Sequence, residues 1–426
     1  MNEDFLHYVW KFQKLETLHF YTTNQEKLHI ITQGSHNCNS GPDFFNAQIE
    51  IDSQLWAGNV EIHIKCSDWY AHGHETDAAY DSVILHVVWE HDVFVFRKDG
   101  SEIPTFEIKK HIPKSTLAQY QKLFSKEKKW INCENDFKNI DLFILENWLE
   151  RLYFERLEKK EEILLKELKD TQNHWESLLF RMLCKNFGLK VNGESFFSIA
   201  KSVDFSVIKK SSQEPEDLEA LLLGQAGLLE EEKEDFYFET LKTKYVYLKH
   251  KFNLQNETVI LPKYFRLRPP NFPTVRLSQF AMLYFQNTNL FSQIMTAEKI
   301  QDYYALFNVC ASNYWDSHYN FGTSSATRKK RITKSFVDLL VINTIIPLKF
   351  CYARQQGKDD SEKLLKLASE ISSEENTIVK KFNSLTTVSK NAYQSQALLQ
   401  LKNEYCDKSK CLQCAVGNSL IGSGQN

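Results

Sequence analysis

The spacing of apolar residues changes from helical to alternating near residue 28. Residues 3–16 carry apolar side chains at helical spacing, which predicts an amphipathic helix with a broad apolar stripe. From Leu28 onward apolar and polar residues alternate with a period of two, which is typical of strands with one buried face. The pattern predicts three successive strands, at residues 28–32, 45–56 and 59–65.

Further strand signals follow a polar segment at residues 67–81, which itself predicts a short helix or a loop. Residues 83–90 are almost continuously apolar, as in a strand that is covered on both faces. Two last apolar segments, 93–97 and 103–108, flank a turn that contains Gly100, and they predict a hairpin.

Helical spacing dominates after Pro113. It predicts one long helix or two at residues 141–170, and another that begins with Asn173 as N-cap and Glu176 as its capping-box partner. The most apolar stretch, residues 335–350, is shorter than the roughly 20 residues of a membrane span and contains charged residues and a proline, so we expect a buried helix.

This order of elements predicts the fold class and three parts of the chain. A helix, three strands, a short helical segment and a strand predict an N-terminal α/β or α+β domain at residues 1–112. We expect a long, mostly α-helical region at residues 113–400 and a Cys-rich C-terminal tail at residues 401–426.

Composition adds a chemical difference between these parts. The 426 residues are 42% hydrophobic, which excludes a disordered chain. The formal net charge of −3 is a sum of unlike parts: residues 1–112 carry 17 acidic and 8 basic residues, hence −9, and the remainder carries 38 and 44, hence +6. Ten of the 13 histidines also lie in the first part. The acidic, His-rich part can therefore hold cations, and the basic remainder can hold polyanions.

Cysteine usage and the first residues bear on the compartment. No basic and apolar leader of a secretory signal is visible at the start of the sequence, and the nine cysteines are an odd number spread over a long chain. Reduced thiols and a cytoplasmic location are therefore expected, with no membrane partner.

Two predicted strands carry polar residues in a pattern that needs an explanation. Asp43 follows a Gly-Pro pair at the start of the second strand, and Glu61, His63 and Lys65 alternate along the third. Strand alternation points the last three toward one face, where they cost desolvation free energy unless they bind something. A solvated face of an edge strand is the alternative.

This arrangement resembles the core of PD-(D/E)XK phosphodiesterases over about residues 3–90. The resemblance implies a restriction-endonuclease-like αβββαβ fold in which Asp43 and Glu61 bind Mg²⁺ or Mn²⁺ through carboxylate oxygens. It also implies that Glu16, placed near the end of the first helix, corresponds to an extra helix-borne acid. The third motif position is His63 and not lysine. His63 would then be a ligand or a base, and Lys65 would supply the cation.

The resemblance implies a function and leaves an alternative open. The function is metal-dependent phosphodiester hydrolysis on nucleic acid, in which Asp43, Glu61, His63 and Lys65 are the catalytic residues. Because the third motif position departs from the family pattern, the alternative is an inactive nuclease-like scaffold. Such a scaffold would bind nucleic acid, or bind a protein partner through the helical region.

A second candidate site follows the third strand directly. Asp68 begins a polar segment that contains His72-Gly73-His74, and two histidines with nearby carboxylates can bind a transition metal such as Zn²⁺. A hydrolase of small molecules that uses this loop is a third possibility, and a plain polar loop is the alternative.

Three cysteines cluster near the C-terminus, at positions 406, 411 and 414. Cys406, Cys411 and Cys414 at this spacing suit Zn²⁺ or an iron–sulfur cluster, and structural free thiols are the alternative. Both metal groups normally need a fourth ligand, for which the candidates are Cys38, Cys310 and Cys351. The cluster is similar in outline to one that holds together the fold of some PD-(D/E)XK nucleases, with one distant cysteine and three near the C-terminus.

Basic residues that could contact phosphates lie outside the acidic part. They are Arg268 and Arg276 in a proline-rich stretch, and the run Arg328, Lys329, Lys330 and Arg331. A solvated helix end is the alternative for such a run of charges.

The whole chain also resembles an uncharacterised bacterial protein family. The likeness is carried by six segments: Gly41-Pro-Asp-Phe, Gly58-Asn-Val-Glu-Ile-His, Ser67-Asp-Trp, His72-Gly-His, Arg268-Pro-Pro-Asn-Phe-Pro and the terminal Cys motif. This resemblance implies no activity.

Overall fold

The computed structural model describes residues 2–16, 19–125 and 127–422, and the chain divides into two compact units. Unit 1 comprises Met1–Trp148 and Leu401–Asn426, and unit 2 comprises Leu149–Gln400. Residues 113–148, which we expected in the helical region, and residues 401–422, which we expected as a tail, thus belong to the same unit as the N-terminal sheet. Unit 2 is continuous in sequence and is inserted between the two segments of unit 1.

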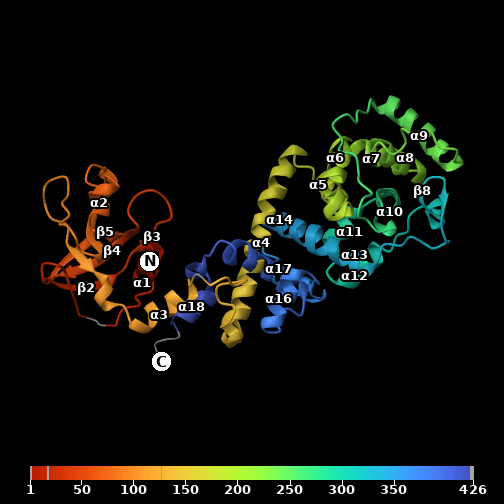
Figure 1. Cartoon of the computed structure of the whole chain (residues 1–426). Coiled ribbons are helices and arrows are strands. Elements are labelled where there is room, and N and C mark those ends of the chain that lie inside the picture. The colour runs from red at the N-terminus through yellow and green to blue at the C-terminus, as the bar shows by residue number, and fades with distance from the viewer. Residues whose placement is uncertain (1, 17–18, 126, 423–426) are drawn as a thin grey trace. The chain divides into compact units, whose positions relative to one another are not determined.

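Unit 1 is built on a seven-stranded sheet with the order β1-β2-β4-β5-β6-β7, in which β3 also pairs with β4 (Figure 1). Neighbouring strands are antiparallel from β1 to β5, whereas β5, β6 and β7 are parallel. The strands are β1 (Phe20–Tyr21), β2 (Lys27–Thr32), β3 (Ser35–His36), β4 (Phe44–Ile51), β5 (Gln54–Lys65), β6 (Val83–Glu90) and β7 (Thr105–Glu107).

The main elements of unit 1 occur in the expected order. Helix α1 (Glu3–Lys11) precedes β2, β4 and β5, and the short helix α2 (Asp68–Ala71) leads to β6. The prediction of a mixed α/β N-terminal part followed by a helical region is confirmed. Along β6 the side chains from Val83 to Val88 are all buried, as its continuous apolar run predicts.

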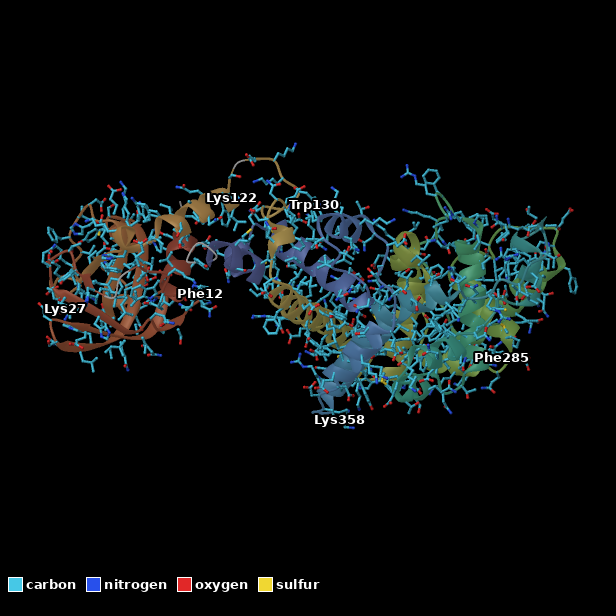
Figure 2. All side chains as sticks on the ribbon, turned by 90° about the horizontal axis from the view of Figure 1, so that it is seen from below. Phe12, Lys27, Lys122, Trp130, Phe285 and Lys358 are labelled. Atoms are coloured by element: carbon cyan, nitrogen blue, oxygen red, sulfur yellow. The ribbon has the colours of Figure 1, made fainter. Side chains whose placement is uncertain are left out.

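Of three local expectations for unit 1, two are corrected, and the expectation of a short helix or a loop at residues 67–81 is confirmed. Helix α1 ends at Lys11 and not near residue 16, and Phe12 follows this end on the surface of the unit, 44% exposed (Figure 2). The polar segment 67–81 contains both α2 and a 3₁₀ turn at Ala78–Tyr80. The expected hairpin at 93–108 is reduced to one bridge, because β7 pairs in parallel with β6 instead.

The remaining helices of unit 1 lie outside the sheet. Helix α3 (Lys114–Leu123) packs against α18 (Ala415–Gly422), so that two segments far apart in the sequence lie side by side (Figure 1). Helix α4 (Leu142–Asp170) begins in unit 1 and continues into unit 2.

Unit 2 is helical apart from a small ribbon of β8 (His318–Asn320) and β9 (Thr323–Ser324) in the part of the chain that the structure describes. Its other helices are α5 (Trp175–Phe187), α6 (Leu189–Lys201), α7 (Phe205–Ser211), α8 (Pro215–Gln225), α9 (Phe236–Phe252), α10 (Pro273–Gln286), α11 (Leu290–Thr296), α12 (Ile300–Leu306), α13 (Lys334–Leu340), α14 (Ile346–Gln355), α15 (Ser361–Ser369), α16 (Thr377–Leu385) and α17 (Ala392–Gln400). Helix α5 is capped by the imidazole of His174, which accepts the Ser177 N–H, and not by Asn173.

Among the described residues, one helical stretch, Lys334–Gln355, is long and apolar enough to cross a membrane by length and composition alone. Most of it, 72% of its most apolar window, is buried inside the protein, which is typical of a core helix. Pro347 has no N–H to donate, and a π-helical turn at Val341–Ile345 precedes it. The prediction of a buried helix at residues 335–350 is confirmed.

Candidate metal centre

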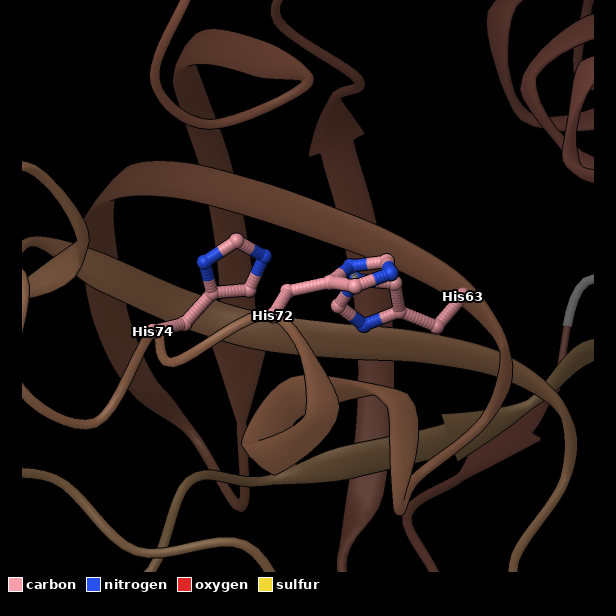
Figure 3. A group of neighbouring side chains, drawn as sticks. All are labelled: His63, His72 and His74. Carbon is pink, nitrogen blue, oxygen red and sulfur yellow. Dashed lines mark hydrogen bonds between the residues drawn. The ribbon is translucent and has the colours of Figure 1, made fainter.

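Three imidazoles meet beside the end of strand β5. His63 projects from β5, His72 caps α2, and His74 lies in the turn that follows (Figure 3). One nitrogen from each ring lies within 4.8 Å of the others. Gly73 adopts a left-handed φ of 73° with open space around it. It thus lets the backbone turn back between His72 and His74.

The carboxylate of Glu61 completes this group. Its Oε1 lies 3.4 Å from Nε2 of His63 and 3.4 Å from Nε2 of His74, and its side chain is 6% exposed. We call Glu61, His63, His72 and His74 the histidine cluster. Three imidazole nitrogens and one carboxylate oxygen at this spacing fit a divalent transition metal such as Mn²⁺ or Zn²⁺ better than Mg²⁺, which prefers oxygen ligands.

Burial makes the charges of the cluster costly without a cation. Burial, aided by the charge of Asp43, raises the pKa of Glu61 to about 9. Burial and the neighbouring histidines lower the pKa of His63 to about 2. Glu61 is therefore protonated and His63 neutral at pH 7 in the metal-free protein, and a bound cation would favour the ionised carboxylate.

Asp43 stands next to Glu61, as its place one strand earlier predicts. The pairing of Phe44 with Val60 brings the start of β4 beside β5. The Asp43 N–H donates to Glu61 Oε2 at 3.1 Å, and Asp43 Oδ2 accepts the Ile62 N–H at 2.9 Å. The two acids thus lie at one place, although 18 residues separate them in the sequence.

Helix α1 contributes two residues that the sequence pattern did not single out. His7 Nε2 lies 3.2 Å from Asp43 Oδ2. Burial lowers the pKa of His7, but the hydrogen bond and charge of Asp43 outweigh it and raise the pKa overall. Burial raises the pKa of Glu3, which also feels the charges of His7 and His72. Glu3 is thus the acid that α1 places near the cluster.

His86 is a further member of the site that sequence reasoning assigned to the core. It is fully buried, as expected, and its Nε2 lies 2.8 Å from Nδ1 of His63. This contact leaves Nε2 of His63 facing Glu61 and His72. The contact results from the parallel register of β5 and β6, which pairs Glu61 with His86. The sequence of a single strand does not reveal its register with a neighbour, so this contact could not be predicted.

Three other candidates lie at the edge of this site or outside it. Lys65 is exposed at the end of β5, where its backbone N–H donates to the Asp68 carboxylate at 2.9 Å. Glu16 is exposed and lies beyond the end of α1, so the expectation of a helix-borne acid at this position is wrong.

Two of the basic candidates are interior residues of unit 2. Arg276 is 8% exposed, donates to Gln279 and Asn271, and lies 3.8 Å from the centroid of the Phe336 ring. Lys330 is 6% exposed, and its ammonium donates to two backbone carbonyls. Both side chains are used within the fold, so the expectation that they contact phosphates is wrong.

The other basic candidates are on the surface of unit 2. Arg268 and Arg328 are exposed, Lys329 pairs with Asp316 at 2.7 Å, and Arg331 donates to Asn308 at 2.7 Å. They remain candidates for contacts with a polyanion.

A family model described as protein of unknown function (DUF2851) matches residues 3–377, a range that contains the histidine cluster and ends before the terminal cysteines. No curated protein and no solved structure matched.

Proposed function

The chain belongs to the DUF2851 family, and we propose that it is a metal-dependent phosphodiesterase that acts on nucleic acid. The observation that carries the proposal is the position of the Glu61 carboxylate, 3.4 Å from the imidazoles of both His63 and His74 and next to Asp43. A buried acid among neutral imidazoles is an arrangement that binding a cation explains.

The histidine cluster supplies the ligands in this proposal. Glu61, His63, His72 and His74 would hold a divalent ion, with Mn²⁺ as the favoured candidate because it accepts both nitrogen and oxygen ligands. Bound there, the ion would polarise a phosphoryl oxygen and lower the pKa of a water molecule. His86 contacts Nδ1 of His63 and would hold this ring so that its Nε2 is left for the ion.

Asp43 and His7 supply a proton path beside these ligands. Their side chains are 22% and 20% exposed, so solvent and substrate can reach them, unlike His63. The Ile62 N–H and His7 hold the Asp43 carboxylate in place, where it can accept a proton from an attacking water.

Nucleic acid is the proposed substrate for two reasons. The order helix, three strands, helix and strand supports the resemblance to the PD-(D/E)XK core, whose members cleave phosphodiesters. Unit 2 also exposes basic side chains such as Arg268 and Arg328, which suit a polyanion.

One observation favours the alternative of an inactive scaffold. The lysine position of the family motif holds His63, and Lys65 is exposed at the end of β5. A protein that keeps the fold and lacks this cation would bind nucleic acid without cutting it.

Cleavage of DNA and RNA in Mn²⁺ by the wild type and by Glu61→Ala tests the proposal. We expect the cleavage rate of the variant to fall by about 100-fold or more. Loss of a residue that orients a metal ligand typically costs about 10–100-fold, and loss of the ligand itself should cost at least as much. Glu90→Ala is the matched control, since Glu90 is an exposed acid at the end of β6. An unchanged cleavage rate in Glu61→Ala would contradict the proposal. Nucleic-acid binding without cleavage by the wild type would favour the inactive scaffold.

A further inference from the structure

Four cysteines of unit 1 line one small cavity. Three of them lie between α17 and α18, at Cys406, Cys411 and Cys414. The fourth, Cys133, lies between α3 and α4. The cavity measures about 20 Å³, and its other walls are mostly apolar: Leu123, Ile131, Phe137, Leu401, Tyr405 and Val416. We call these four cysteines and their surroundings the cysteine cavity.

The fourth cysteine differs from the three that the sequence suggested. Cys38 is exposed, and Cys310 and Cys351 belong to unit 2. Cys133 is 8% exposed and Cys414 is 6% exposed, so both sulfurs lie inside unit 1. Cys133 is distant from the other three cysteines in the sequence. Its neighbour Asn132 forms a hydrogen bond with Cys411, which follows 279 positions later.

Hydrogen-bond donors point at the sulfurs. Asn132 Nδ2 donates to Cys411 Sγ at 3.4 Å. The backbone N–H groups of Val416 and Gly417 and the indole of Trp148 lie near the sulfur of Cys414. Such donors stabilise a thiolate more than a thiol, because hydrogen bonds to an ionised acceptor are stronger.

Gly417 makes this arrangement possible. A Cβ at position 417 would overlap the carbonyl oxygen of Cys411, so only glycine lets α18 begin against the turn at Cys411–Gln413. The close approach carries the N–H groups of α18 toward Cys414 while Cys411 faces the same cavity.

We propose that Cys133, Cys406, Cys411 and Cys414 bind one Zn²⁺ ion that joins the two ends of unit 1. Four thiolates are a donor set of closed, structural zinc sites. The cavity volume has room for a single water-sized particle, which fits one ion and not a cluster of iron and sulfide. This proposal stands independently of any activity at the histidine cluster.

Metal analysis of the full chain, purified without chelator, tests the proposal. The background carries His72→Ala and His74→Ala, so that zinc at the histidine cluster is not counted. We expect one zinc per chain in this background and none after adding Cys133→Ser. Cys38→Ser is the matched control and should keep the zinc, because Cys38 is exposed.

A second measurement keeps the test valid if Cys133→Ser fails to fold. Co²⁺ exchanged into the otherwise unchanged chain should give the intense charge-transfer absorption of a tetrahedral four-thiolate site. Iron with acid-labile sulfide, zinc that persists in Cys133→Ser, or a cobalt spectrum without thiolate bands would each overturn the proposal.

Discussion

The histidine cluster and the cysteine cavity lie in the same unit but differ in donor atoms and in access. The cluster offers nitrogen and oxygen donors, and His72 and Asp43 are open to solvent. The cavity offers sulfur donors behind apolar walls. Catalytic metal sites keep a position open for substrate, whereas structural sites are closed by four protein ligands. The difference therefore fits the catalytic role that we propose for the cluster and the structural role that we propose for the cavity.

The largest expected effect concerns stability. Cys133→Ser should lower the melting temperature of unit 1 by about 10 °C or more, because several kcal/mol of zinc binding are lost and each is worth roughly 2–4 °C in a unit of this size. Differential scanning calorimetry measures the change, with Cys38→Ser as the control. Metal binding at the histidine cluster should persist below the new melting temperature. If that binding is lost while unit 1 is still folded, the separation between the two sites is wrong.

The next effect concerns metal affinity at the histidine cluster. His74→Ala should weaken Mn²⁺ binding by about 10–100-fold, while the melting temperature changes little, because His74 is a partly exposed ligand. Isothermal titration calorimetry measures the affinity. His29→Ala, an exposed histidine of β2, is the matched control. Equal affinities in the two variants would remove His74 from the ligand set.

The pH dependence of binding follows from the pKa of Glu61. In the metal-free protein this pKa is raised to about 9, so Glu61 carries a proton below that pH and must release it when a cation binds. Affinity should therefore rise up to about tenfold per pH unit between pH 6 and pH 9 and level off above. Calorimetry in buffers of different ionisation enthalpy counts the released proton. Glu61→Gln should release none, and release by this variant equal to the wild type would assign the proton elsewhere.

The smallest effect separates backbone strain from metal binding. Gly73→Ala and Gly100→Ala both place a side chain at a positive φ with open space around it, and each should cost about 1 kcal/mol of stability. Only Gly73→Ala should also weaken Mn²⁺ binding, since Gly73 lies between two ligands. Chemical denaturation and a metal titration of both variants check this. A similar loss of affinity in Gly100→Ala would show that the effect is global.

The sequence predicts all four members of the histidine cluster, as two neighbouring candidate sites, and misses the residues around it for identifiable reasons. Glu61 and His63 alternate on one strand, and Asp43 opens the strand before, so a period of two is enough to place them together. His86 joins them through the register of a parallel pair, and His7 through the packing of a helix on the sheet. Neither relation is local in sequence.

The cysteine cavity and the basic residues also depend on contacts between residues that are distant in the sequence, which the sequence alone does not reveal. Three cysteines within nine residues indicate a site, but Cys133 reaches it only because the chain returns to unit 1 after unit 2. Arg276 and Lys330 lie in charged or proline-rich segments that resemble surface, yet the fold buries them against Phe336 and backbone carbonyls. Charge in a sequence does not by itself reveal which side chains are paired inside.

Because unit 2 is inserted into unit 1, the two segments of unit 1 are synthesised at different times. The sheet of β1 to β7 is complete by residue 107, whereas Cys406 and α18 are translated only after unit 2. Until then the partner surface on α3 and the thiol of Cys133 are without their C-terminal contacts. A chain that stops before Cys406 can fold its sheet and still lack the closing segment, so the two segments of unit 1 meet only after all of unit 2 has been translated.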